Sequence, residues 1–167
     1  RYPAPARLSV VMLAFSIMLT GCLSRPTLPA STYSLHRAPA SAPVSRARAD
    51  LVRLTARQIG TPYRYGGNSE RGFDCSGLVQ YVHHQVGVRV PRTAAEQWRR
   101  GADLRRRHLV PGDLVFFAID SRKSNHVGIY EGGGVFIHAP SSGKRVERAS
   151  LNNPYWRQRL VGARSYL

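Results

Sequence analysis

The stretch from Tyr63 to Gln85 constrains the fold more than any other part of the sequence. A glycine-containing loop leads into Asp74-Cys75, and a run with helical spacing follows. Its apolar residues are Leu78, Val79, Val82 and Val86. Asp74 is suited to cap such a helix, since its carboxylate can accept from the first unpaired backbone N–H groups. The sequence therefore predicts a helix from Cys75 to about Val86 with a thiol in its first turn.

A helix N-terminus favours a negative charge, but the helix alone does not ionise the thiol. The effect reaches about 2 kcal/mol in favourable cases, which corresponds to roughly 1.5 pKa units. A cysteine that starts near about 8.5 would still be mainly protonated at neutral pH. An imidazolium about 4 Å away would contribute roughly 4 kcal/mol. We therefore expect a histidine further along the chain to lower the pKa of Cys75.

Two histidines lie in alternating segments that predict a β-hairpin. His126 begins the segment that ends at Glu131, and His138 lies near the end of the segment from Val135 to Ala139. A run of glycines separates the two segments. An even register, reached through a three- or five-residue loop, would place the two rings directly opposite each other, with Cβ atoms about 4.5–5.5 Å apart. We predict that register, because an odd one would place the rings on opposite faces.

The remaining pattern indicates helices first and strands afterwards. Helices are expected from Asp50 to Ile59 and from the capping box Thr93-Ala-Ala-Glu96 to Gly101. Further strands are expected at Asp113–Ile119, Arg145–Ala149 and Val161–Tyr166, with a short extended piece at Val88–Val90. This order predicts an α+β domain with an antiparallel sheet. His83 and His84 are interpreted as surface residues, and Trp98 and Trp156 as core or groove wall.

Several blocks of sequence, in the same order, resemble the NlpC-type cell-wall peptidases, a papain-like cysteine peptidase family. The blocks include Phe73-Asp74-Cys75-Ser76-Gly77-Leu78-Val79, Pro91-Arg92-Thr93, His126-Val127-Gly128-Ile129-Tyr130 and Phe136-Ile137-His138-Ala139. The resemblance extends from about Asp50 to the C-terminus. It implies a papain-like domain whose central helix carries the cysteine and packs on an antiparallel sheet of about five to six strands.

The resemblance also implies roles for individual residues. Cys75, His126 and His138 would be the catalytic nucleophile, base and orienting residue, and Tyr63 would assist the oxyanion. Asp74 and Ser76 would line the substrate subsite, although Asp74 could be only a helix cap. No metal or cofactor is expected; a zinc site built from one cysteine and two histidines is the alternative, but these residues lack typical ligand spacing.

The implied activity is that of a peptidoglycan endopeptidase, which cuts amide bonds in murein stem peptides or cross-links. The alternatives are a non-catalytic lipoprotein that binds cell wall or a partner on the same fold, and an acyltransferase or amidase. The net charge of +16, from 25 basic and 9 acidic residues, suits an anionic partner or an arginine-rich solvated surface. Nucleic acid is not favoured, because the arginine clusters at 99–100 and 105–107 lack interleaved aromatic residues. Nothing in the sequence indicates an oligomeric state.

The N-terminal residues predict a lipid anchor. The uncharged run from Leu8 to Leu19 is short for a membrane span, and Leu19-Thr20-Gly21-Cys22 resembles a bacterial lipobox. We expect a signal peptide at 1–21, a lipidated Cys22 with a flexible linker at 22–48, and a catalytic domain at 49–167. The protein would then sit in the cell envelope on the periplasmic side of the outer membrane, with Cys75 as its one free thiol.

Overall fold

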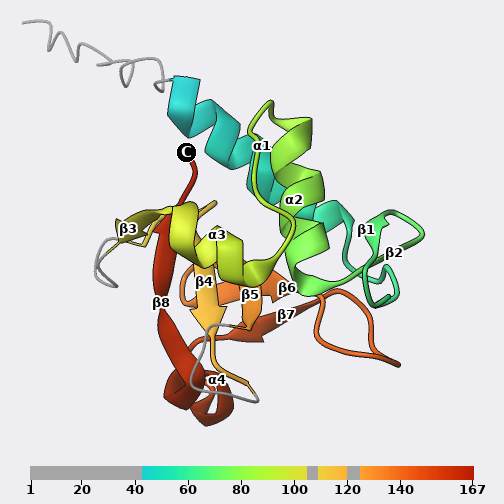
Figure 1. The fold of residues 1–167 in the computed structure, drawn as a ribbon. Helices are drawn as coiled ribbons and strands as arrows, with labels where there is room; N and C mark the ends of the chain where they lie inside the picture. The colour runs from blue at the N-terminus through green and yellow to red at the C-terminus, as the bar shows by residue number, and fades with distance from the viewer. Residues whose placement is uncertain (1–42, 105–108, 120–124) are drawn as a thin grey trace, which may run out of the picture. The chain divides into compact units, whose positions relative to one another are not determined.

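The computed structural model describes residues 43–104, 109–119 and 125–167. Its helices are α1 (Pro43–Arg57), α2 (Cys75–Gln85), α3 (Ala94–Arg100) and α4 (Pro154–Arg159). Its strands are β1 (Asn68–Ser69), β2 (Gly72–Phe73), β3 (Ala102–Leu104), β4 (Leu114–Phe117), β5 (His126–Gly132), β6 (Val135–His138), β7 (Glu147–Ser150) and β8 (Leu160–Ser165). Figure 1 shows α1 and α2 side by side, and α4 at the N-terminal end of β8.

Six strands form one antiparallel sheet in the order β3-β8-β4-β5-β6-β7, and β1 pairs with β2 separately. The helix α2 packs on β5, at the middle of the sheet. The predicted α+β class is confirmed, and so is a central cysteine-bearing helix on an antiparallel sheet. This arrangement brings the start of α2 to the strands that carry His126 and His138.

Apolar side chains fill both sides of the sheet, because neighbouring residues of a strand point to opposite faces. On the helix side, Leu51 of α1 and Leu78, Val79 and Val82 of α2 pack against Phe116, Val127 and Ile129. On the other side, Val115, Phe117 and Phe136 pack with Trp156 of α4. A sheet covered on both faces gives the strand ends a rigid frame.

Local signals closely predict two of the four helices in the part of the chain that the structure describes. Asp74 caps α2, and its side chain accepts from the Gly77 N–H at 2.6 Å. Thr93 caps α3 and accepts from the Glu96 N–H, as the capping box predicts. The short elements β1, β2, β3 and α4 were not predicted, and Val88–Val90 is not a strand.

The first helix begins earlier than the sequence predicts. It starts at Pro43, so the last six residues of the proposed linker, 43–48, are helical. Arg48 bonds the start of this helix to the rest of the domain. Its guanidinium donates to Asp113 Oδ1 at 2.7 Å and to the carbonyl of Leu167 at 2.8 Å. Composition alone cannot reveal contacts to residues so distant in sequence. Cys22 and the predicted signal peptide lie outside the described residues.

The prediction of a surface position is wrong for His83 and correct for His84. The His83 side chain is fully buried, whereas His84 is exposed. His83 lies four residues after Val79 and therefore shares the buried face of α2. The ring Nδ1 lies 2.8 Å from the Val79 carbonyl oxygen, and the ring meets Tyr166 edge-on.

The hairpin of β5 and β6 has the predicted parity, but its register and loop differ from the prediction. Ile129 pairs with Ile137, so His138 lies two residues away from the position directly opposite His126. The loop has two residues, Gly133 and Gly134, with φ of 57° and 80° as a type I′ turn requires. A shift between Tyr130 and Gly132 then restores an even register, since such a bulge adds one residue to one strand. Both imidazoles therefore reach the same face.

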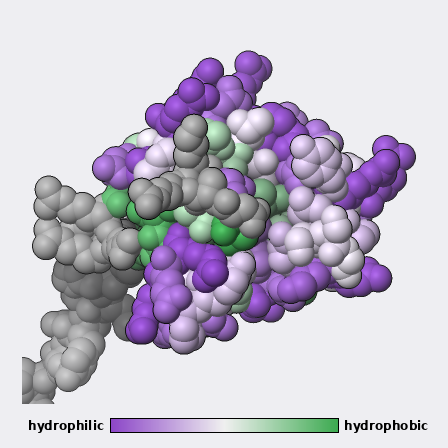
Figure 2. Space-filling model, turned by 60° about the horizontal axis from the view of Figure 1, so that its bottom comes forward, coloured by the Kyte–Doolittle hydropathy of each residue, from purple (hydrophilic) through white to green (hydrophobic). Residues whose placement is uncertain are grey.

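The visible surface is mainly hydrophilic (Figure 2). On the face shown in Figure 2, hydrophilic residues surround a smaller group of hydrophobic ones. Among the helices of the described residues, none has the length and apolar character needed to cross a membrane.

Candidate active site

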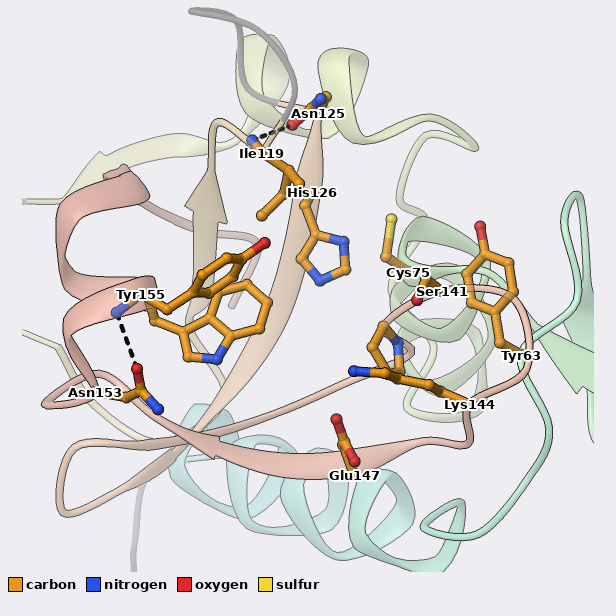
Figure 3. Close-up of a pocket in the computed structure, with 12 residues that line it drawn as sticks. Tyr63, Cys75, Ile119, Asn125, His126, Ser141, Lys144, Glu147, Asn153 and Tyr155 are labelled. Atoms are coloured by element: carbon orange, nitrogen blue, oxygen red, sulfur yellow. Dashed lines mark hydrogen bonds between the residues drawn. The ribbon is translucent and has the colours of Figure 1, made fainter.

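A cavity of about 580 Å³ opens where the start of α2 meets the end of the sheet. This volume lies within the usual range for small-molecule and peptide sites. The lining residues come from the start of α2 and the loop before it, from β5, from β7 and the loop before it, and from α4. They include Tyr63, Cys75, Asn125, His126, Pro140, Ser141, Lys144, Glu147, Asn153, Tyr155 and Trp156. Figure 3 shows the Cys75 sulfur and the His126 ring facing each other in this cavity.

Asp74 fixes the helix start that carries the thiol. Besides its bond to Gly77, the carboxylate accepts from the Gly66 N–H at 3.0 Å and from both Arg92 nitrogens at 2.9 and 2.5 Å. Burial alone would raise the pKa of Asp74, but the bonds from Arg92 and Gly77 lower it below its usual value. Gly77 has no room for a Cβ against the Gly67 carbonyl, so the loop closes tightly on the helix. The cap is confirmed, and its oxygens are already engaged within the protein.

His126 and His138 form a hydrogen-bonded pair. The Nε2 of His126 lies 2.9 Å from the Nδ1 of His138, and their rings are nearly perpendicular. His138 is fully buried behind His126, and His126 keeps 6% of its surface exposed. Trp156 stacks on His126 at 5.6 Å between ring centres and meets His138 edge-on at 4.8 Å. The Nδ1 of His126 is therefore the ring nitrogen left for the thiol.

Burial shifts the pKa values of these groups toward their neutral forms. It raises the pKa of Cys75, although the N–H groups of Val127, Ser76 and Cys75 itself oppose the shift. Burial lowers the pKa of His126 to about 4, and burial with the charges of His126 and Lys144 lowers that of His138 to about 3. The expected lowering of the thiol pKa is therefore wrong for the resting site. A neutral His126 supplies no imidazolium charge to stabilise a thiolate.

Tyr63 and Ser76, the two other predicted site residues, have different surroundings. Tyr63 is half-buried and lines the same cavity, and its pKa is raised by burial and then by the neighbouring charges of Cys75 and Asp74. Ser76 is buried; its hydroxyl donates to Asp74 Oδ1 at 3.2 Å and receives a bond from Arg92 at 3.1 Å. Tyr63 thus lines the cavity, whereas the Ser76 hydroxyl is bonded to the Asp74–Arg92 pair; their roles at the oxyanion and in the substrate subsite stay predictions.

Sequence reasoning missed Arg92 and Glu147 and gave Lys144 no role. Arg92 lies within a block that carries the family resemblance, Pro91-Arg92-Thr93, and this block was the only signal for it. Glu147 and Lys144 reach the cavity through β7 and the loop before it, and no local pattern indicates this. Trp156 does form a wall of the groove, as predicted. Within the described residues, no group of three His, Cys, Asp or Glu side chains could hold a metal ion.

The described fold, with a cysteine at the start of a helix packed on an antiparallel sheet, defines a papain-like domain of the NlpC type. The chain belongs to the NlpC/P60 family, whose model matches residues 60–165. Solved structures of similar proteins have the same fold. An NlpC/P60 family protein from Bacillus cereus superposes with a TM-score of 0.69 at 38% identity, over 72% of this chain and 40% of that one. The NlpC/p60 domain of the peptidoglycan hydrolase SagA superposes with a TM-score of 0.63 at 34% identity, over 71% of this chain and 97% of that one.

Curated relatives are similar in sequence over the same region. The murein DD-endopeptidase MepH of Escherichia coli is 45% identical over 74% of this chain and 47% of its own length. The probable endopeptidase NlpC of Escherichia coli is also 45% identical, over 63% of this chain and 69% of its own length. The gamma-D-glutamyl-L-lysine dipeptidyl-peptidase of Bacillus cereus is 39% identical over 71% of this chain and 36% of its own length. The chain thus spans about half or less of several relatives that it matches.

Proposed function

We propose that this chain is a cysteine peptidase that hydrolyses amide bonds in the stem peptides or cross-links of peptidoglycan. Cys75 is the nucleophile, His126 the general base and acid, and His138 the residue that orients His126. The observation that carries the proposal is the 2.9 Å bond between His126 Nε2 and His138 Nδ1 beside the thiol. That bond turns the other nitrogen of His126 toward the cavity, where a proton can be exchanged.

The neutral resting pair determines how the thiol would react. His126 removes the thiol proton as the sulfur attacks the substrate carbonyl, so thiolate and imidazolium form only in the reaction. The tetrahedral oxyanion is met by the Cys75 N–H and the Tyr63 hydroxyl. His126 then gives the proton to the leaving amine, which departs and leaves a thioester on Cys75. Water, activated by the same histidine, attacks the thioester and releases the new carboxylic acid.

The class of substrate is inferred from the relatives. Their printed names describe murein endopeptidase activity in one case and gamma-D-glutamyl-L-lysine dipeptidyl-peptidase activity in another. These names imply different scissile bonds, so the proposal extends to the peptide part of peptidoglycan and not to one bond. Lys144 supplies a positive charge in the cavity that suits the carboxylate groups of such peptides.

Incubation of the purified full chain with isolated peptidoglycan tests this function. We expect the wild type to release cleaved peptides, identified by mass spectrometry, and Cys75→Ala to release none. The matched control is His84→Ala, which changes an exposed residue of the same helix. Equal release by wild type and Cys75→Ala would refute cysteine catalysis. Binding without release by either protein would instead favour a cell-wall-binding module.

We further propose that residues 1–21 are a lipoprotein signal peptide and that Cys22 carries the lipid that holds the protein at the outer membrane. This placement would bring the domain to its polymeric substrate. Expression in a Gram-negative host, followed by intact-mass measurement of the membrane fraction, tests it. We expect the mass of a chain that begins at a lipid-modified Cys22, and a product without lipid from Cys22→Ser. An unmodified wild-type chain would refute the anchor.

A further inference from the structure

One nitrogen of the buried histidine pair lacks a hydrogen bond. His138 is fully buried, and its Nδ1 is engaged with His126. Its other nitrogen, Nε2, has no hydrogen-bond partner among the described residues. A buried polar atom without a partner is costly, at about 1–3 kcal/mol. Such an atom beside a reactive site therefore requires an explanation.

The hydrogen-bond geometry determines which ring nitrogens carry protons. His126 can accept a proton from Cys75 at Nδ1 only if that nitrogen is unprotonated, so neutral His126 carries its proton on Nε2. That Nε2–H donates to the Nδ1 of His138, which must then be unprotonated. Neutral His138 therefore carries its proton on Nε2. The nitrogen without a partner is a donor, and it needs an acceptor.

Glu147 is the acceptor that the fold places there. It is the cross-strand partner of His138 in the pairing of β6 with β7. Its Oε1 lies 3.9 Å from His138 Nε2, beyond hydrogen-bond distance, but a change of side-chain rotamer can close the gap. Glu147 lines the cavity with its side chain 51% exposed, and Figure 3 shows it on the same side of the cavity as Lys144.

We propose that Glu147 is a positioning residue of this site: it accepts the Nε2–H of His138 and thereby fixes the orientation and tautomer of both histidines. Its role in catalysis rests on the proposed function. No proton needs to reach Glu147. When His126 takes the thiol proton, its ring becomes positive, both N–H donors stay in place, and the carboxylate opposes the new charge through His138.

The charged groups around His138 act in opposite directions. Lys144, in the loop before β7, and a protonated His126 both disfavour a positive charge on His138. Glu147, on β7, favours it. The two histidines and their neighbours titrate as a coupled unit. Removal of the Glu147 carboxylate should therefore lower the pKa of the histidine pair, which sets the acidic limb of the pH–rate profile.

Kinetics of three full-length variants test the proposal. Glu147→Gln keeps an acceptor without the charge, and Glu147→Met removes both. Glu131→Gln is the matched control, because Glu131 is a carboxylate of the same sheet that pairs with Arg148 instead. We expect kcat to fall about threefold in Glu147→Gln and about tenfold in Glu147→Met, with KM changed less than about twofold. The acidic limb of kcat/KM should move to lower pH by roughly half a unit in both.

A merely structural role would lower the thermal stability without moving the acidic limb. If both Glu147 variants match Glu131→Gln in kcat and in the acidic limb, the inference is overturned while the peptidase function stands. If the wild type cuts no peptidoglycan, ¹⁵N NMR of the imidazoles decides the inference separately. We then expect His138 to be protonated at Nε2 in the wild type and a mixture of tautomers in Glu147→Met. Identical imidazole spectra in the two proteins would refute the inference.

Discussion

His83, near the end of α2, and His138, at the end of β6, are two fully buried imidazoles in different surroundings. Both have an Nε2 without a hydrogen-bond partner among the described residues. Burial lowers both pKa values, to about 4 for His83 and about 3 for His138. By burial and protonation alone, the two residues cannot be distinguished.

The neighbours of each ring make the difference. His83 binds the carbonyl of Val79 within its own helix, so its bond is local and its position is in the packed core. His138 binds a second imidazole, which in turn lines a cavity with a thiol. A shifted pKa therefore marks a site only together with a titratable partner and access for a substrate. The following predictions test this distinction.

The largest expected effect is on His126. His126→Gln removes the proposed base, and we expect kcat to fall roughly a thousandfold, within the range for general acid–base catalysis. His83→Gln changes an equally buried histidine of the core and should leave kcat within about twofold. Steady-state kinetics on peptidoglycan fragments, with thermal unfolding as a folding check, measure both. Similar losses of kcat in two folded variants would abolish the distinction.

His83 should instead affect stability, in a way that depends on pH. A histidine whose folded pKa lies below its unfolded value stabilises the fold above about pH 6.5 and loses that contribution as the pH falls to about 4. The shift corresponds to about 3 kcal/mol. In His83→Leu this part of the acid destabilisation should be missing. Urea unfolding at about pH 7.5 and about pH 4.5 measures it, and an equal loss in wild type and variant would contradict the prediction.

The sequence predicts those features of the fold that depend on residues close together along the chain. The cap at Asp74, the start of α2 at Cys75 and the capping box of α3 all follow from residues within one helical turn. Burial of His83 was also predictable, because it continues the apolar face formed by Val79 and Val82. The polarity of the imidazole favours a surface position, but its spacing from Val79 places it on the buried face.

Contacts between distant segments could not be predicted in this way. The parity of the hairpin follows from the chemistry required of two histidines, but the two-residue loop and the bulge depend on the glycine conformations. The bond from Arg48 to Asp113 and the place of Glu147 behind His138 are set by the folded sheet. Local periodicity contains no information on either.

The opposite end of α2 supplies the third prediction. Asp74→Ala removes a helix cap and leaves the partly buried Arg92 without its carboxylate, so we expect the free energy of unfolding to fall by about 2 kcal/mol. Asp74→Asn keeps a cap acceptor and should cost about half as much. Urea unfolding compares the two. If Ala and Asn are equally tolerated, the bonds to Arg92 and Gly77 do not hold this end of the helix.

The smallest expected effect is on Lys144, and its sign matters more than its size. After burial and His126, the charge of Lys144 lowers the pKa of His138, so Lys144→Gln should raise it. Because Lys144 is exposed, solvent and salt screen its interaction with His138. The acidic limb of kcat/KM should therefore move to higher pH by less than about half a unit. This direction is opposite to that expected for Glu147→Gln. If both variants move the acidic limb in the same direction, the pKa of the histidine pair does not follow the sign of the nearby charge. His138 would then resemble His83 in not responding to charged groups at the cavity.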